Sequence, residues 1–140
     1  MDLRAVYGST TTVTVSGLAT LANATSATSD AIDNTSNLFL DALVEVVADT
    51  ASGASASGYI EIYAKGSVDG VDYDDDNNDK WVGTINLVTG GVATRKRVVS
   101  VAASFGGSLP PFWKVRIRNV SGAALTAGTV QYRGVKAQSV

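Results

Sequence analysis

A strict alternation of apolar and polar residues in two segments restricts the fold of this chain more than any other feature. In segment 58–66 (GYIEIYAKG), Ile60 and Ile62 alternate with tyrosines and charged residues. In segment 112–120 (FWKVRIRNV), Val115 and Ile117 alternate with basic residues. A period of two places successive side chains on opposite faces of an extended backbone. Both segments are therefore predicted to be strands with one face in a core.

Several further segments are rich in valine, threonine, isoleucine and aromatic residues, which favour strands. They are Thr12–Val15, Lys80–Val88, Arg95–Ser104 and Gly128–Val135. Glycine-containing breaks such as TASGASASG, FGGSLPP and NVSGAALTAG separate them, as is typical of turns. The pattern predicts an all-β fold: a single antiparallel β-sandwich of about eight strands, as a jelly roll or another Greek-key arrangement, with the jelly roll preferred.

Segment 36–50 (SNLFLDALVEVVADT) fits either a helix or a strand. A helix would place its three acidic residues on one stripe. A strand would place Leu38, Leu40 and alternate residues up to Ala48 on one face. The strand is preferred, because β-branched residues crowd the end of the segment and the neighbouring segments are strands.

The chain divides into three stretches within one domain. Residues 1–22 are predicted to be an N-terminal arm and the first strand. Residues 23–36 are small and polar and are predicted to be a connector without regular structure. Residues 37–140 hold the remainder of the same sandwich.

The chain contains no histidine and no cysteine. Disulfides, thiolate metal sites, the usual zinc ligand and the Ser-His-Asp relay are thereby excluded. An enzyme would have to use carboxylates, lysine or tyrosine alone, and no spacing in the sequence singles out an acid–base pair. We therefore expect a protein that is not an enzyme and that has no catalytic residues, metal site or cofactor.

Two absences in the sequence bear on location. No apolar run approaches the roughly 18 residues that a membrane helix needs. The first 15 residues lack a basic start followed by an apolar stretch, so no signal peptide is visible. We expect a protein that is made in the cytoplasm and has no membrane partner.

Charge is distributed very unevenly along the chain. Residues 1–80 hold all 13 acidic residues and three basic ones, a net charge of −10, whereas residues 81–140 hold eight basic residues and no acidic one. Two interpretations stay open. The two halves can interleave in the fold and neutralise each other, or they can form separate acidic and basic faces that join neighbours in an assembly.

The acidic residues are densest in segment 69–80 (DGVDYDDDNNDK). Part of it has the 1-3-5 spacing of an EF-hand calcium loop, but the twelfth position is Gly83 rather than glutamate and the flanks are strand-like, so an EF-hand is rejected. Asp69-Gly70 is a turn signal, and we expect an exposed loop between strands. A looser calcium site, built together with other loops, stays open as the weaker alternative. Five carboxylates form the candidate acidic contact set for a partner: Asp72, Asp74, Asp75, Asp76 and Asp79.

The basic residues cluster in two strands. The candidate basic contact set is Arg95, Lys96, Arg97, Lys114, Arg116 and Arg118. In the second strand the three basic side chains share one face, which we expect to be exposed. Such a stripe can be simply a solvated sheet face, and as a binding surface it suits an acidic protein. Nucleic acid is the weaker alternative, because no aromatic stacking platform accompanies the stripe.

Four aromatic residues suggest a second possible function. Trp81, Tyr59, Tyr63 and Tyr73 are candidates for stacking on sugars, as in sandwich-type carbohydrate-binding modules. Packing in the core or at its rim is the competing role for all four.

The segment YIEIYAKGSVDGVDYDDD, with Ser67, Asp69, Gly70 and Tyr73 after a strand, resembles small all-β proteins of tailed-phage heads. The upstream LFLDALVEVV and the downstream PFWKVRIRNVSG fit the same picture. Over about residues 37–135 the chain resembles the jelly-roll cement (decoration) proteins of tailed-phage capsids, although the shared motifs are strand and turn patterns without a catalytic signature.

The resemblance implies a virion structural protein that binds the outside of the capsid shell and bridges neighbouring major capsid subunits. It also implies a small homo-oligomer, for which we expect a dimer rather than a trimer, and no cofactor. Residues Thr12, Val13, Thr14 and Val15 are the candidates for adding a strand to the sheet edge of a partner, because a terminal segment is free to reach out.

Overall fold

The computed structural model describes residues 2–139, which form ten strands and two short 3-10 helices. No helix in this part of the chain is long and apolar enough to cross a membrane. The elements are β1 (Leu3–Tyr7), β2 (Thr11–Val13), η1 (Leu18–Thr20), β3 (Thr25–Thr28), β4 (Ile32–Asp33), β5 (Asp41–Thr50), β6 (Tyr59–Ser67), β7 (Lys80–Asn86), β8 (Ala93–Ser100), η2 (Ala102–Phe105), β9 (Phe112–Val120) and β10 (Ala127–Ser139).

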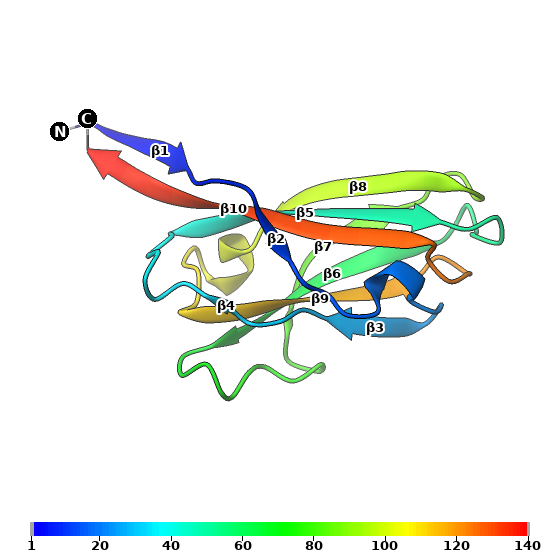
Figure 1. Ribbon diagram of the computed structural model, residues 1–140, viewed down its shortest axis with the longest axis horizontal. Coiled ribbons are helices and arrows are strands. Elements are labelled where there is room, and N and C mark those ends of the chain that lie inside the picture. Colours follow the sequence, from blue (N-terminus) through cyan, green and yellow to red (C-terminus); the bar gives the residue numbers. More distant parts are fainter. Residues whose placement is uncertain (1, 140) are drawn as a thin grey trace.

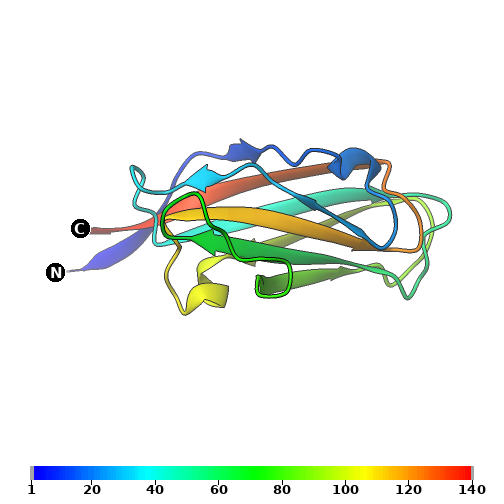
Figure 2. The same ribbon diagram turned by 90° about the horizontal axis from the view of Figure 1, so that it is seen from below.

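The strands form two antiparallel sheets packed face to face (Figures 1 and 2). One sheet has the order β1-β10-β5-β8, with β2 also paired to β10, and the other has the order β3-β9-β6-β7, with β4 also paired to β9. If β1 and β2 count as one interrupted strand, and β3 and β4 as another, the eight strands have the order of a jelly roll, and the chain changes sheet at every step except from β6 to β7. The predicted all-β sandwich is confirmed.

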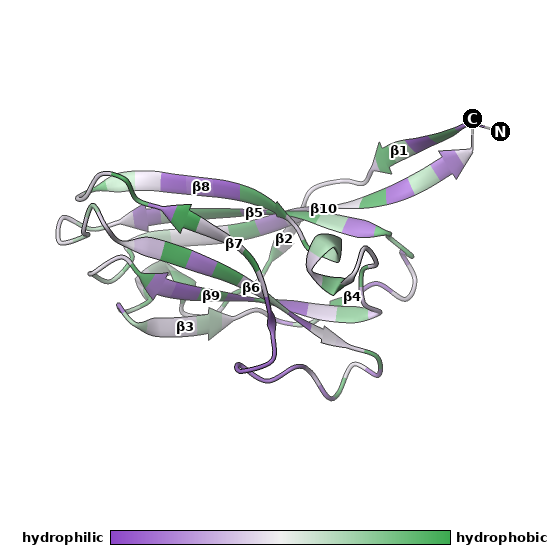
Figure 3. Ribbon diagram, turned by 180° about the vertical axis from the view of Figure 1, so that it is seen from behind, coloured by the Kyte–Doolittle hydropathy of each residue, from purple (hydrophilic) through white to green (hydrophobic). Residues whose placement is uncertain are grey.

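Alternate residues of the central strands build the core between the sheets. Ala42, Val44, Val46 and Ala48 on β5 are fully buried. The inward residues of β6 and β9 meet them from the opposite sheet, so the period-two pattern read from the sequence is the pattern of burial. Figure 3 shows the same alternation of hydrophobic and hydrophilic residues along the ribbon.

The aromatic pair Trp113 and Tyr132 lies in this core. Trp113 on β9 is fully buried, and its ring meets the ring of Tyr132 on β10 edge-on, with centroids 5.2 Å apart and planes at 77°. Because β9 and β10 belong to different sheets, this contact spans the interior of the sandwich. An edge-to-face pair contributes about 1 kcal/mol beyond the area that it buries.

The ambiguous segment is a strand, β5, but it begins later than the expected apolar face. Leu38 and Leu40 precede the strand and are exposed, contrary to the prediction. Leu38 has a φ of 53°, so the chain turns there and the alternation is interrupted. Phe39 lies between them and packs on Gly134, where an added Cβ would come within 2.2 Å of the ring.

The prediction that residues 23–36 form an irregular connector is wrong. The stretch contains β3 and β4, which both pair with β9. Buried polar side chains fix it in place: Asn34 bonds both main-chain groups of Phe39, and the Ser29 hydroxyl accepts from the Val115 amide. The lack of large apolar residues led to the wrong prediction, because a short edge strand needs main-chain partners rather than large apolar residues.

The two ends of the chain form a ribbon that projects beyond the sandwich (Figure 1). All five residues of β1 pair with the last residues of β10, from Leu3 with Ser139 to Tyr7 with Val135. The pairing of β10 with β5 stops at Val135, so the ribbon from there outward has only two strands. The ribbon consists of residues 3–7 and 135–139, and both of its outer edges lack a paired strand among residues 2–139.

Close packing of the turn after β9 against the start of β6 predicts a sharp difference between two glycines. A Cβ added to Gly58 would lie 2.7–2.9 Å from main-chain atoms of Ser121, whereas one added to Gly53 would make an ordinary 3.4 Å contact with Ala123. We expect Gly58→Ala to lower the free energy of unfolding by about 1–3 kcal/mol. Gly53→Ala should stay within about 1 kcal/mol of the wild type. Denaturant unfolding measures both, and equal stabilities would contradict the packing.

Candidate functional site

The acidic loop between β6 and β7 (residues 68–79) folds back over the outer face of its own sheet. Asp79 makes two contacts with Arg116 on β9, at 2.6 Å to Nε and 3.1 Å to Nη2. Lys65 on β6 lies 2.6 Å from Asp76 and 3.5 Å from Asp79. Two cations from neighbouring strands therefore hold two carboxylates of the loop.

This ion network is largely shielded from solvent. The side chains of Lys65 and Arg116 are each 7% exposed and that of Asp79 is 2% exposed, whereas that of Asp76 is 68% exposed. The hydrogen bond with Asp79 raises the pKa of Arg116, and the hydrogen bond with Lys65 lowers the pKa of Asp76. The guanidinium of Arg116 also lies over the ring of Tyr63, 4.1 Å from its centroid.

Two members of the predicted contact sets are therefore wrongly assigned. Arg116 does not lie on an exposed basic stripe, and Asp79 is not free to meet a partner, because the two side chains bind each other. The alternation does place Arg116 on the outer face of β9. The loop that covers this face is far away in the sequence, so its contact could not be read from the strand pattern.

The remaining aspartates of the loop mostly hold its backbone. Asp69 accepts bonds from the amides of Val71 and Asp72 and from the Ser67 hydroxyl, which lowers the pKa of its carboxyl group. Gly70 has a φ of 78°, as the predicted Asp-Gly turn requires. The predicted loop between strands is confirmed.

Asp74 and Asp75 also bind main-chain amides of this region, whereas the side chain of Asp72 does not. Asp74 accepts from the amide of Gly66, and Asp75 accepts from Asn77 and Asn78. The side chain of Asp72 is exposed and has no hydrogen-bond partner among residues 2–139. Within the same range, no group of three or more carboxylates is placed to hold a metal ion.

The basic residues of β8 are divided between the two faces of the strand. Arg95 and Arg97 lie on the inward side at the edge of the sandwich and donate to main-chain carbonyls: Arg95 to Leu87 and Thr89, and Arg97 to Thr84. They join β8 to β7 and the turn after it. Arg95 is half-buried, so its assignment to a partner-contact set is corrected, because strand alternation turns it towards the other sheet. Arg97 is exposed despite its bond to Thr84, and its assignment stays a prediction.

Lys96, Lys114 and Arg118 remain closer to the surface. Lys96 lies 3.8 Å from Glu45 and Arg118 lies 3.6 Å from Glu61, with side chains 62% and 41% exposed. Lys114 lies over the ring of Tyr73. Because Glu45 and Glu61 come from the acidic half of the chain, these pairs favour the interleaved arrangement of the two halves.

The proposed strand-adding segment, Thr12–Val15, is already paired within the chain. Thr12 and Val13 belong to β2 and pair with Gln131 and Val130, and Val13 is buried. The main-chain oxygen of Thr14 accepts from Asp30, and Val15 packs against the core. The prediction of a free arm here is wrong, because the alternation of threonine and valine fits a half-buried strand equally well.

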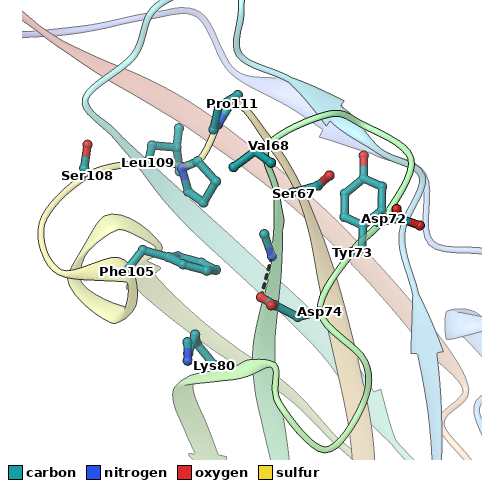
Figure 4. A pocket seen from close by; sticks show the side chains of 12 residues that line it. Ser67, Val68, Asp72, Tyr73, Asp74, Lys80, Phe105, Ser108, Leu109 and Pro111 are labelled. Atoms are coloured by element: carbon teal, nitrogen blue, oxygen red, sulfur yellow. Dashed lines mark hydrogen bonds between the residues drawn. The ribbon is translucent and has the colours of Figure 1, made fainter.

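A pocket of about 650 Å³ opens beside the acidic loop (Figure 4). Its apolar wall comes from η2 and the segment after it, chiefly Phe105, Leu109 and Pro110. The opposite wall comes from the acidic loop, with Asp72 and Asp74, and Lys80 lies below them (Figure 4). Sequence reasoning missed this pocket, because FGGSLPP was interpreted only as a turn.

The aromatic residues considered for sugar binding separate into two groups. Tyr59 and Tyr63 on β6 share the outer face of the sheet with Trp81 on β7, which pairs directly with Tyr63. Trp81 is 57% exposed, and its indole N–H donates to Thr84. Tyr73 instead lines the pocket.

Comparison with known proteins yields no family. No family model matches the chain, and no curated protein matches it. A solved structure of a xylanase variant, Xylanase10C from Cellvibrio japonicus in complex with xylopentaose, is similar over 97% of this chain and 26% of its own, at 19% identity and a TM-score of 0.40. The chain thus spans about a quarter of that structure, and a similarity this weak carries no argument about function.

The difference in burial between Asp79 and Asp76 gives a matched test of the ion network. Asp79→Asn leaves two buried cations short of their partner, so we expect the free energy of unfolding to fall by about 3 kcal/mol. Asp76→Asn removes an exposed carboxylate that contacts the same cations, and its expected cost is below about 1 kcal/mol. Chemical denaturation of the two variants measures the difference. A similar loss in both would show that burial does not set the strength of this network.

Proposed function

We propose that this chain is a non-enzymatic virion structural protein that binds the outside of a capsid shell and cements neighbouring major capsid subunits. The observation that carries the proposal is the terminal ribbon, which extends from the sandwich and is not covered by any other element of residues 2–139 (Figure 2). The protein would be made in the host cytoplasm and act on the outer capsid surface. Its partners would be the major capsid protein and further copies of itself, with no nucleic acid and no membrane.

The two faces of the ribbon differ in character. Residues that pair directly point to the same face, so Leu3, Ala5 and Tyr7 share one face with Val135 and Ala137. Leu3 is 68% exposed and Tyr7 is 55% exposed. A two-stranded ribbon with an uncovered apolar face is only marginally stable in water. The ribbon is stabilised most when another subunit covers its apolar face, which suits a protein that joins other subunits.

Lys96 and Arg118, which belong to the basic contact set and are only loosely paired, are the candidates for touching the shell. Lys96 lies on the outer face of one sheet and Arg118 on that of the other, and each faces a single carboxylate at more than 3.5 Å. Such loosely paired surface cations contribute little to folding. They remain available to an acidic neighbour, and their attraction weakens with salt.

Charge reversal at these two positions tests the contact with the shell. We expect Lys96→Glu with Arg118→Glu to lower occupancy on capsid shells about tenfold or more at low ionic strength, because like charges would then face each other. Each reversal made singly is compared with Arg133→Glu, which changes net charge equally at an exposed position outside the contact set, the ribbon and the pocket. Co-sedimentation with shells at several salt concentrations measures occupancy. Binding of Lys96→Glu and Arg118→Glu equal to that of Arg133→Glu would rule out this contact.

A carbohydrate-binding sandwich is the second candidate, and the face shared by Tyr59, Tyr63 and Trp81 favours it. Trp81 is 57% exposed and lies beside Tyr63, and exposed apolar side chains that gather on one face mark interaction sites. The bond to Thr84 holds the indole of Trp81 in place. Arg116 covers the ring of Tyr63, so Trp81 is the ring that is open to stack on a sugar.

A glycan screen distinguishes this candidate from the first. If the sheet face binds sugars, Trp81→Ala should abolish a saturable signal while leaving the melting temperature nearly unchanged, because the side chain is exposed. Tyr7→Ala removes an aromatic of similar exposure on the ribbon and should leave binding intact. The absence of saturable binding by the wild type would end the carbohydrate proposal.

A further inference from the structure

We propose that the terminal ribbon of one copy of this protein binds the pocket beside the acidic loop of a second copy, and that the two copies do so reciprocally. The inference rests on the assembling role proposed for the ribbon and names its partner. The protein's self-association in solution, without shells, is what tests it. A failure here and a failure of shell binding are therefore seen separately.

The pocket offers an apolar surface of suitable size for the ribbon. Its volume of about 650 Å³ holds several side chains, and Phe105, Leu109 and Pro110 form one wall. Four large apolar residues near it are also exposed: Leu38 and Leu40 before β5, and Val68 and Val71 on the acidic loop. Apolar residues concentrated on one end of a small protein mark an interaction surface. The apolar face of the ribbon can pack on this wall, while its other face, which carries Arg4 and Lys136, turns towards the acidic loop that forms the opposite wall.

The charges of the two surfaces are complementary. The ribbon carries Arg4 and Lys136, and within residues 2–139 neither lies within ion-pair distance of a carboxylate. The acidic loop carries Asp72 and Asp74 at the pocket, and no cation pairs with either side chain in that same range. One cation, Lys80, also lines the pocket, so the loop side keeps an excess of negative charge. Such an arrangement favours the basic ribbon and disfavours acidic occupants.

The position of the two surfaces makes the contact reciprocal. Both η2 and the acidic loop lie at the end of the sandwich from which the ribbon projects, as the two perpendicular views show (Figures 1 and 2). Two copies placed head to head can therefore each extend a ribbon onto the other about a two-fold axis. The five residues of β1 span roughly 16 Å, enough to cross the mouth of a pocket of this size. An isologous contact of this kind closes at two copies.

A charge-swap experiment tests the proposal on the full chain. Arg4→Glu cancels the net charge of the ribbon and sets a carboxylate against an acidic pocket, and Asp72→Arg makes the pocket basic against a basic ribbon. Each variant alone carries two repulsive contacts per dimer, and we expect its dissociation constant to rise at least about tenfold. In an equimolar mixture, Glu at position 4 meets Arg at position 72 in one contact and the wild-type pair remains in the other. Heterodimers should then form with nearly wild-type affinity.

Sedimentation velocity over a concentration series provides the readout, with circular dichroism to verify folding. Two charge reversals on other exposed surfaces, Arg133→Glu and Asp30→Arg, are the controls and should dimerise like the wild type. A second pair of variants tests the apolar contact. Leu3→Ser should weaken dimerisation. Val88→Ser, at a similarly exposed residue in the turn after β7, should not.

Three results would overturn the proposal. The first is a wild-type protein that stays monomeric up to about 1 mM. The second is undiminished dimerisation of Arg4→Glu or Asp72→Arg. The third is a mixture of these two variants that associates no better than either variant alone. Rescue in the mixture, with controls at the wild-type level, supports the reciprocal contact.

Discussion

The packing of β5 and β10 against β6 and β9 is the interaction on which the rest of this structure depends. These four strands supply most of the fully buried side chains, and Trp113 meets Tyr132 between them. Every other element is positioned by pairing with one of them: β1, β2 and β8 in one sheet, and β3, β4 and β7 in the other. Because one face of each strand is buried in the core, charged side chains and binding surfaces lie on the opposite faces and on the connections.

The use of charge in this protein follows from that division. On the outer face of the second sheet, Arg116 and Lys65 are covered by the loop that carries Asp76 and Asp79. A buried ion pair adds little net stability over apolar packing, but it strongly disfavours any arrangement that separates its members. The network therefore fixes where the acidic loop lies. That placement forms one wall of the pocket.

The sequence allowed the fold to be predicted well and the site poorly, for a physical reason. The alternation in β6 and β9 shows which face of each strand is buried and which is not. This local signal was enough to predict the strands and the sandwich. The partners of Arg95, Arg116 and Asp79 depend on which distant segments lie side by side, and a single sequence does not contain that information. The ribbon was missed for a related reason. Residues 3–7 have no clear strand pattern in their sequence, and they form a strand by pairing with the other end of the chain.

The arginines of β8 have a consequence for how the molecule behaves in a crowded solution. An edge strand with free carbonyl groups invites further strands, and a sandwich with such an edge on every side tends to grow into aggregates. Here Arg95 and Arg97 occupy carbonyls of β7 and of the turn that follows it. The side of the molecule where β7 and β8 meet is therefore a poor place for sheet extension. The outer edges of the terminal ribbon lack a paired strand among residues 2–139, so the end from which the ribbon projects is open to strand addition where the β7–β8 side is not.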